Sequence, residues 1–121
     1  MKQFLGDPSR FAQFIYLDGC EAPRGFAEAS IRSDYVNGAT SSPVAFLEGI
    51  FVEPRARRTG VARRLVEEIS AWARDRGLSE LASDADLSNT ISHAVHSGLG
   101  FEETERVVFF RMPTGGPVRT P

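Results

Sequence analysis

The sequence has one cysteine, Cys20, and no long apolar run. A single thiol cannot form an intrachain disulfide or a cysteine metal cluster. Its position beside Gly19, in a predicted hairpin loop, favours an ordinary loop thiol over a nucleophile. No stretch approaches the roughly 20 apolar residues of a membrane span, and residues 1–7 lack the hydrophobic region of a signal peptide. We therefore expect a cytoplasmic protein.

An excess of charge of one sign is also lacking. Fourteen basic and 16 acidic residues give a net charge of −2, with the two signs interspersed. Such a surface does not attract a nucleic-acid backbone or an anionic membrane, so we expect neither as a partner. With 121 residues, 41% of them hydrophobic, the chain can form one core. We expect a single domain over residues 1–112 and, because Pro and Gly dominate the end, a disordered tail over 113–121.

The chain does have a strongly patterned stretch between residues 44 and 76. The segment 44–52 is mostly apolar, and a basic turn follows Pro54. Beyond this turn, apolar residues recur at intervals of three and four, as on one face of an amphipathic helix. Gly77 is the natural stop of that helix, because glycine adopts the left-handed conformation of a C-terminal cap without strain. These helix-face residues are Val61, Leu65, Ile69 and Trp72.

The start of the predicted helix carries an unusual charge. A helix N-terminus exposes unpaired N–H groups and the positive end of the dipole, so acids are normal there. Here Arg57, Arg58, Arg63 and Arg64 occupy it, at a cost of up to about 1 kcal/mol each unless an anion binds. A phosphate or pyrophosphate held by the amides of residues 59–62 is the simplest ligand; a merely solvated basic face is the alternative. The turn lacks both the Walker sequence and a dinucleotide-binding glycine pattern.

The motif Arg57-x-x-Gly60-x-Ala62 after a strand resembles the pyrophosphate loop of the Gcn5-related N-acetyltransferases, which use acetyl-CoA. Between about Phe11 and Arg111 the chain closely resembles the aminoglycoside 6'-N-acetyltransferases of that family. The resemblance implies acetyl-CoA-dependent acetylation of the 6'-amino group of these antibiotics, hence antibiotic resistance, by a homodimeric enzyme. The segments that carry it are residues 26–38, 46–52, 82–84, 89–92 and 99–106.

The resemblance also implies an α/β (α+β) fold: a mixed, mostly antiparallel sheet with a splayed central strand and flanking helices. From residue patterns we expect a hairpin, a loop over 33–43 and a central strand, followed after the long helix by a short strand, a short helix and a final strand. A helix between two such strands implies a parallel pair. Within the central strand, Glu48-Gly49 interrupts the apolar run and predicts a bulge. The expected strands are 12–17, 24–32, 44–52, 78–83 and 107–111, and the short helix runs from 88 or 89 to about 97–98.

The expected cofactor site is made mainly of backbone. If the bulge splays the central strand, the N–H and C=O groups of Ile50, Phe51 and Val52 lose ladder partners and can bind the pantetheine arm as an added strand. Asn89 could either cap the short helix or bond the pantetheine arm, and the resemblance favours the second role. The loop residues of the predicted site are Arg57, Arg58, Thr59, Gly60, Val61, Ala62 and Arg63.

The acceptor site is expected from acids at strand ends. Glu48 stands in an apolar strand, Asp84 ends the next strand and Glu105 precedes the last one. Three converging carboxylates would suit a polyamine sugar, whereas a buried carboxylate taken singly could be paired internally. The candidate internal partners are Arg32, Arg106 and Arg111. The resemblance implies that Tyr35, Glu48, Asp84 and Glu105 contact the antibiotic, and that Glu48 or Asp84 accepts the amine proton.

Two features separate the chain from the family pattern. Related enzymes begin with a strand and two helices that we do not expect here, because Phe11 already matches their second strand; those helices form one wall of the acceptor pocket. The exposed edge of the second strand then predicts a homodimer. In related enzymes a tyrosine near the final strand often protonates the thiolate, but the apolar run 107–110 has no tyrosine, so no proton donor is assigned.

We interpret His93 as a surface residue and His96 as a packing or cofactor-adjacent one. An acyl-CoA-binding module without antibiotic acetylation, or an acetyltransferase of another small amine or peptide, remains an alternative.

Overall fold

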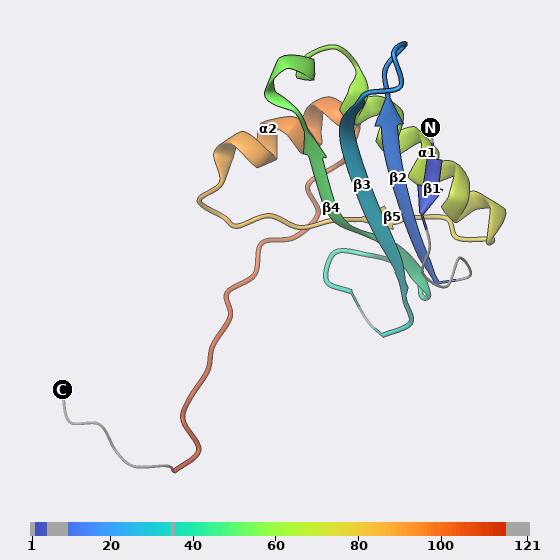
Figure 1. The fold of residues 1–121 in the computed structure, drawn as a ribbon. Helices are drawn as coiled ribbons and strands as arrows, with labels where there is room; N and C mark the ends of the chain where they lie inside the picture. Colours follow the sequence, from blue (N-terminus) through green and yellow to red (C-terminus); the bar gives the residue numbers. More distant parts are fainter. Residues whose placement is uncertain (1, 5–9, 35, 116–121) are drawn as a thin grey trace.

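A computed structural model describes residues 2–4, 10–34 and 36–115, with side chains described from Arg10 onward. Its centre is a five-stranded sheet in the order β1-β2-β3-β4-β5 (Figure 1). In the described part, no helix is long and apolar enough to cross a membrane. The elements are β1 (Lys2–Phe4), β2 (Phe11–Leu17), β3 (Pro23–Arg32), β4 (Val44–Val52), the short 3₁₀ helix η1 (Pro54–Ala56), α1 (Val61–Asp75), β5 (Leu81–Ala82) and α2 (Thr90–Leu99).

The sheet is mixed, as predicted. Neighbouring strands from β1 to β4 are antiparallel, and β5 lies parallel to β4 after the crossover through α1. Side chains alternate between the two faces, so that Ala12 and Phe14 of β2 and Ala27 of β3 are buried on one face. This face packs against α1, which crosses behind β2 and β3 in Figure 1.

The long helix α1 supplies the other half of the core. Leu65 and Ile69 are fully buried and Trp72 nearly so, on the face that the apolar spacing predicted. Gly77 adopts a left-handed conformation, with φ of 76°. The N–H of Leu78 then donates to the carbonyl of Ala73 at 3.0 Å and closes the last turn. The predicted helix and its glycine stop are confirmed.

The predicted bulge lies in β4. Glu28 of β3 is opposite Gly49, whereas the next residue, Ala29, is opposite Leu47. Glu48 is therefore the extra residue, which confirms the prediction and bends the strand at this point. On its other side, β4 pairs with β5 only at Ala45–Leu81 and Phe46–Ala82. The two strands separate immediately before the bulge, and we call this point the fork.

Several boundaries differ from the sequence-based expectations. Residues 2–4 form a strand, β1, where none was expected, and they cover β2 from Gln13 to Ile15. The edge that was expected to be free is thus partly paired. The predicted strand 78–83 is reduced to Leu81–Ala82, and α2 begins at Thr90 and ends at Leu99.

The predicted final strand over 107–111 is wrong. These residues belong to a segment that leads away from the sheet (Figure 1), and no described strand lies beside them to provide a ladder. Their apolar side chains are consequently exposed, Phe110 by 91%. The predicted tail over 113–121 falls mostly on residues 116–121, which lie outside the described residues, so it stays a prediction.

Candidate active site

The loop between β4 and α1 presents a row of backbone donors. Arg58 and Gly60 both have left-handed backbone, with φ of 63° and 90°. Alternation of right- and left-handed residues creates a concave nest of N–H groups that binds anions. The first hydrogen bond of α1 runs from Arg64 N–H to the Gly60 carbonyl at 3.0 Å, and the helix has neither a side-chain cap nor an acid in its first turn. Six consecutive N–H groups therefore have no partner among the described residues: those of Arg58, Thr59, Gly60, Val61, Ala62 and Arg63.

The arginines around this loop do not all face a ligand freely. Arg57 Nε donates to the Val52 carbonyl at 3.1 Å, and Arg63 Nη2 donates to the Gly98 carbonyl of α2 at 2.7 Å. Arg64 forms ion pairs within α1, with Glu67 at 3.8 Å and Glu68 at 3.2 Å. Arg58 has no partner in the described part of the chain. An anion in the loop would thus be held chiefly by amides and the Arg58 side chain, with the other guanidinium groups fixing the frame.

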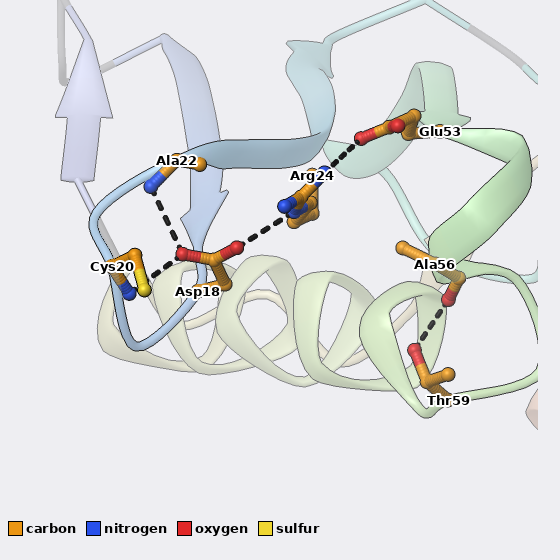
Figure 2. Close-up of polar contacts among 7 residues, drawn as sticks. All are labelled: Asp18, Cys20, Ala22, Arg24, Glu53, Ala56 and Thr59. Atoms are coloured by element: carbon orange, nitrogen blue, oxygen red, sulfur yellow. Dashed lines mark hydrogen bonds and ion pairs between the residues drawn. The ribbon is translucent and has the colours of Figure 1, made fainter.

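A charged network anchors the start of this loop (Figure 2). Arg24 donates from Nε to Asp18 and from Nη1 to Glu53, both at 2.7 Å. Asp18 also accepts the N–H groups of Ala22 and Cys20, at 3.0 and 2.8 Å. The Ala22 hydrogen bond, followed by those from Arg24 and Cys20, holds the pKa of Asp18 below its ordinary value. The β2–β3 turn is thereby joined to the residue that immediately precedes η1.

The same network borders a cavity of about 410 Å³. Arg55 and Thr59 line it beside Asp18 and Arg24, and the Thr59 hydroxyl donates to the Ala56 carbonyl (Figure 2). Sequence reasoning did not single out Arg24, because its two partners lie 6 and 29 positions away and no local pattern connects them. Only the fold brings these charges together.

The free edge of β4 connects the fork to the loop. On the β3 side, Ile50, Phe51 and Val52 pair with residues 25–27. On the other side, no described strand pairs with β4 beyond Phe46. The predicted edge for the pantetheine arm is therefore open, and it ends next to the row of unpaired amides.

Glu48 lies at the fork, but it is not deeply buried as expected. Its side chain is 34% exposed, since the extra residue of a bulge leaves the regular in–out alternation. Its carboxylate forms an ion pair with Arg32 at 2.9 Å and accepts the hydroxyl of the buried Ser30. Partial burial raises the pKa of Glu48, but the hydrogen bonds from Arg32 and Ser30 outweigh this effect and leave it below the ordinary value. Arg32 is thus the internal cation that the sequence analysis considered.

The other predicted acceptor residues are only partly assembled. Asp84 is exposed and lies two residues beyond the last β5 pair, just as Glu48 lies two residues beyond its β4 partner. Asp84 has no partner among the described side chains. Glu105 is exposed after α2 and lies beside the β3–β4 loop, where a Cβ at Gly38 would touch Thr104 and Glu105. The fold therefore brings Glu48 and Asp84 to the fork, leaves Glu105 beside that loop, and places Tyr35 outside the described residues.

Asn89 is the N-cap of α2. Its Oδ1 accepts the N–H of Ser92 at 3.0 Å, so the capping role that the sequence left open is observed. The Nδ2 group of Asn89 has no partner among the described residues. A contact between this group and the cofactor stays a prediction.

Comparison with known proteins gives a consistent result. The model of the acetyltransferase (GNAT) family matches residues 1–101. An aminoglycoside N(6')-acetyltransferase type 1 of Serratia marcescens is 51% identical over 116 residues, which cover 95% of this chain and 78% of that relative. A protein with the same name from Acinetobacter genomosp. 13 is 60% identical over 115 residues, with the same two coverages.

Solved structures give the same result in three dimensions. The aminoglycoside 6'-N-acetyltransferase AAC(6')-Ih of Acinetobacter baumannii has a TM-score of 0.83 and 50% sequence identity, covering 88% of this chain and 72% of that chain. AAC(6')-Iy, in complex with the bisubstrate analogue CoA-S-monomethyl-acetylneamine, has a TM-score of 0.78 and 54% identity, covering 87% and 71%. That complex joins CoA and an aminoglycoside in one ligand.

Proposed function

Because the chain belongs to the GNAT acetyltransferase family, we propose that it transfers the acetyl group of acetyl-CoA to the 6'-amino group of aminoglycosides. The observation that carries this proposal is the row of six unpaired amides at the start of α1, which continues into the free edge of β4. An anion site and an open strand edge in one line suit a pyrophosphate with an attached amide-containing arm. The similar enzymes named above are described as acting at the 6' position.

Acetyl-CoA would lie along this line. Its pyrophosphate would accept hydrogen bonds from the amides of residues 58–63, beside the Arg58 guanidinium. Its pantetheine arm would pair with the backbone of Ile50, Phe51 and Val52, as a strand pairs with a free edge. The thioester then approaches the fork, where Glu48 and Asp84 lie.

The acceptor would bind through its ammonium groups at the fork. Glu48 already shares its negative charge with Arg32, whereas Asp84 has no described partner. We therefore assign Asp84 as the group that accepts the amine proton, and Glu48 as an orienting group for a neighbouring ammonium. Charge-assisted contacts of this kind contribute about 1.5–3 kcal/mol each. Tyr35 and Glu105 remain predicted contacts of the sugar.

Mass spectrometry tests the proposed function. Kanamycin or tobramycin incubated with the protein and acetyl-CoA should gain one acetyl group, and the Asp84→Asn variant should slow this reaction. An aminoglycoside with a hydroxyl in place of the 6'-amine is the matched control and should not react. Binding of CoA without acetylation of any aminoglycoside would contradict the proposal and favour an acyl-CoA-binding module; acetylation of only other amines or peptides would favour the remaining alternative.

We also propose a homodimer that works in the cytoplasm, where acetyl-CoA is made. Support for association comes from the exposed apolar side chains of Val108, Phe109, Phe110 and Met112, which are 73–91% exposed. Contiguous apolar surface of this kind commonly marks a protein interface. The near-neutral charge of the chain supports neither a nucleic acid nor a membrane as the partner.

A further inference from the structure

A serine–histidine pair next to the fork has no role in the proposed function so far. Ser83, the residue after β5, has its Oγ at 2.8 Å from Nε2 of His96 on α2. The other ring nitrogen, Nδ1, lies 2.8 Å from the Ser92 carbonyl oxygen. The His96 ring also packs edge-on against Phe101, with the ring centroids 5.1 Å apart. Ser83 and His96 are both half-buried, so the pair is held in place yet reachable.

The shorter of two Nδ1 contacts selects the tautomer of the neutral imidazole. A carbonyl oxygen can only accept, so Nδ1 carries a proton and donates it to the Ser92 carbonyl at 2.8 Å; the Ser92 hydroxyl oxygen, 3.2 Å from Nδ1, is then a second acceptor. In neutral His96, Nε2 is then an acceptor and takes the Ser83 hydroxyl proton. In the imidazolium form, Nε2 donates to the Ser83 oxygen, and the hydroxyl proton is released to point elsewhere. The charge of His96 therefore decides whether Ser83 can donate a proton to a third group.

The position of Ser83 indicates which group could accept its hydroxyl proton. The row of unpaired amides and the fork lie at opposite ends of the free β4 edge. An arm that starts at the amides and follows this edge from Val52 back to Glu48 covers about 13 Å, at roughly 3.3 Å per residue. Its end lies at the fork, where Ser83 follows the last pair between Phe46 and Ala82. For acetyl-CoA, the end of the arm is the thioester sulfur.

The geometry points to Ser83 as the group that protonates the departing CoA thiolate, with His96 acting through Ser83; this inference rests on the proposed function. When the tetrahedral intermediate collapses, the carbon–sulfur bond breaks and its electron pair goes to sulfur. The sulfur takes the Ser83 hydroxyl proton, and the Ser83 oxygen takes the Nε2 proton of the His96 imidazolium. The neutral His96 is then protonated again from solvent, while the amine proton leaves through Asp84. The relay replaces the hydroxyl that the run Val107–Phe110 lacks.

Several charged and titratable groups lie on the segments that flank Ser83 and His96 in the chain, on β4, and on α1 where it contacts the end of α2. The relay requires the imidazolium, so the rate of the chemical step should fall as pH rises through the His96 titration. The charged and titratable groups on these elements are Glu48 of β4, Asp84 and Asp86 after β5, His93 of α2, Arg63 of α1, and Glu102 and Glu103 after α2.

Nuclear magnetic resonance tests the position of the relay without any turnover. The imidazole signals of His96, assigned with the His96→Gln variant, are titrated with pH in the presence of CoA and of desulfo-CoA, which lacks the sulfur. Both ligands carry the same pyrophosphate and arm. We expect the apparent pKa of His96 to differ between the two complexes, because only CoA places a thiol beside Ser83. The His93 signals provide the internal control and should be the same in both complexes.

Single-turnover acetylation, with enzyme in excess, tests the role of the relay. Ser83→Ala and His96→Gln should each slow the chemical step about 100-fold and remove its decline at high pH. Acetyl-CoA affinity should change less than threefold, and the double variant should be no slower than the slower single variant, because the two residues act as a unit. His93→Gln is the matched control and should react like the parent protein.

The outcomes separate the relay from the proposed function. Identical His96 titrations with CoA and desulfo-CoA, or variants that keep the high-pH decline, overturn the relay alone. Acetylation of no aminoglycoside, together with a sulfur-dependent His96 titration, overturns the acceptor assignment and leaves the relay in place. Failure to bind CoA contradicts both.

Discussion

Glu48 and Asp84 occupy matching positions at the fork, but their environments differ. The Glu48 carboxylate is held by Arg32 and Ser30, and the Arg32 guanidinium also lies 3.6 Å from the centre of the Phe46 ring. Asp84 is exposed and has no described partner. A shared charge attracts an ammonium less strongly than a free one, which is why we propose that Glu48 orients the acceptor and that Asp84 accepts its proton.

The Glu48 interactions predict a pH-dependent contribution to stability. Because the folded-state pKa lies below the unfolded value of about 4.3, the contribution is present above that pH and is lost as pH falls through the folded pKa. We expect Glu48→Gln to lower the free energy of unfolding at pH 7 by up to about 1 kcal/mol, and to have less effect at lower pH. Urea unfolding between pH 7 and pH 3 measures the difference. In an Arg32→Gln background the difference should shrink to the part that the Ser30 hydrogen bond contributes; if it persists unchanged, the ion pair is not its source.

The hydrogen bonds of Arg24 lead to a second prediction, which concerns the affinity for CoA. Replacing it by Met keeps the length of the side chain but removes both hydrogen bonds, so Glu53 is no longer tied to the β2–β3 turn. A displaced loop weakens every contact that its amides make, and we expect CoA affinity to fall roughly tenfold. Calorimetry with CoA measures this fall. Arg55→Met removes the same charge from the same cavity without cutting the network, and should have a smaller effect. Equal losses in the two variants would indicate that charge alone matters.

At the scale of elements, the sequence predicted best what depends on near neighbours. The helix α1, its glycine stop and the bulge at Glu48 follow from residue spacing and backbone preference within a few positions. The segment 107–111 has the composition of a strand, but a strand requires a neighbouring ladder, and none of the described strands lies beside it. The ion pairs of Arg24 and Arg32 likewise join residues that only the sheet brings together. Local structure, the hairpin and the parallel pair were thus predictable, and Arg32 was among three candidate partners of Glu48, whereas the Arg24 network and the absence of a strand at 107–111 were not predictable from the sequence.

The loop before α1 allows a direct test of phosphate binding, through substitutions at Gly60. Gly60 has a φ of 90°, and a Cβ built there would meet no atom within 4 Å, so there is room for a side chain beside the amides where we propose that the pyrophosphate binds. Asp and Asn tolerate left-handed backbone about equally well, which makes Gly60→Asn a matched control for Gly60→Asp. We expect both variants to fold and the Asp variant to bind CoA at least about tenfold more weakly than the Asn variant, because like charges repel. Equal CoA affinities in a titration would exclude a phosphate at this loop.

At the scale of the molecule, the sheet is covered unequally. One face packs against α1, whereas on the other the rings of Phe26 and Phe51 form an exposed pair, with centroids 6.1 Å apart. The segment that ends at Met112 adds further exposed apolar surface. The short strand β1 covers part of the β2 edge, so that edge is a weaker basis for association than the sequence predicted. The exposed apolar segment is the stronger one.

We therefore predict that the homodimer depends on this segment. Sedimentation at a protein concentration on the order of 10 μM should give the mass of two chains, since even a micromolar dissociation constant leaves most of the protein dimeric there. Phe110→Glu places a charge on a side chain that is 91% exposed, and should shift the protein to monomer without changing the core. Leu87→Glu, at a 58% exposed apolar residue before α2, is the control and should leave the dimer intact. A parent protein that sediments as a monomer contradicts the homodimer itself. If the Phe110→Glu variant remains dimeric, the interface does not depend on this segment, and the exposed face around Phe26 and Phe51 is the next surface to test.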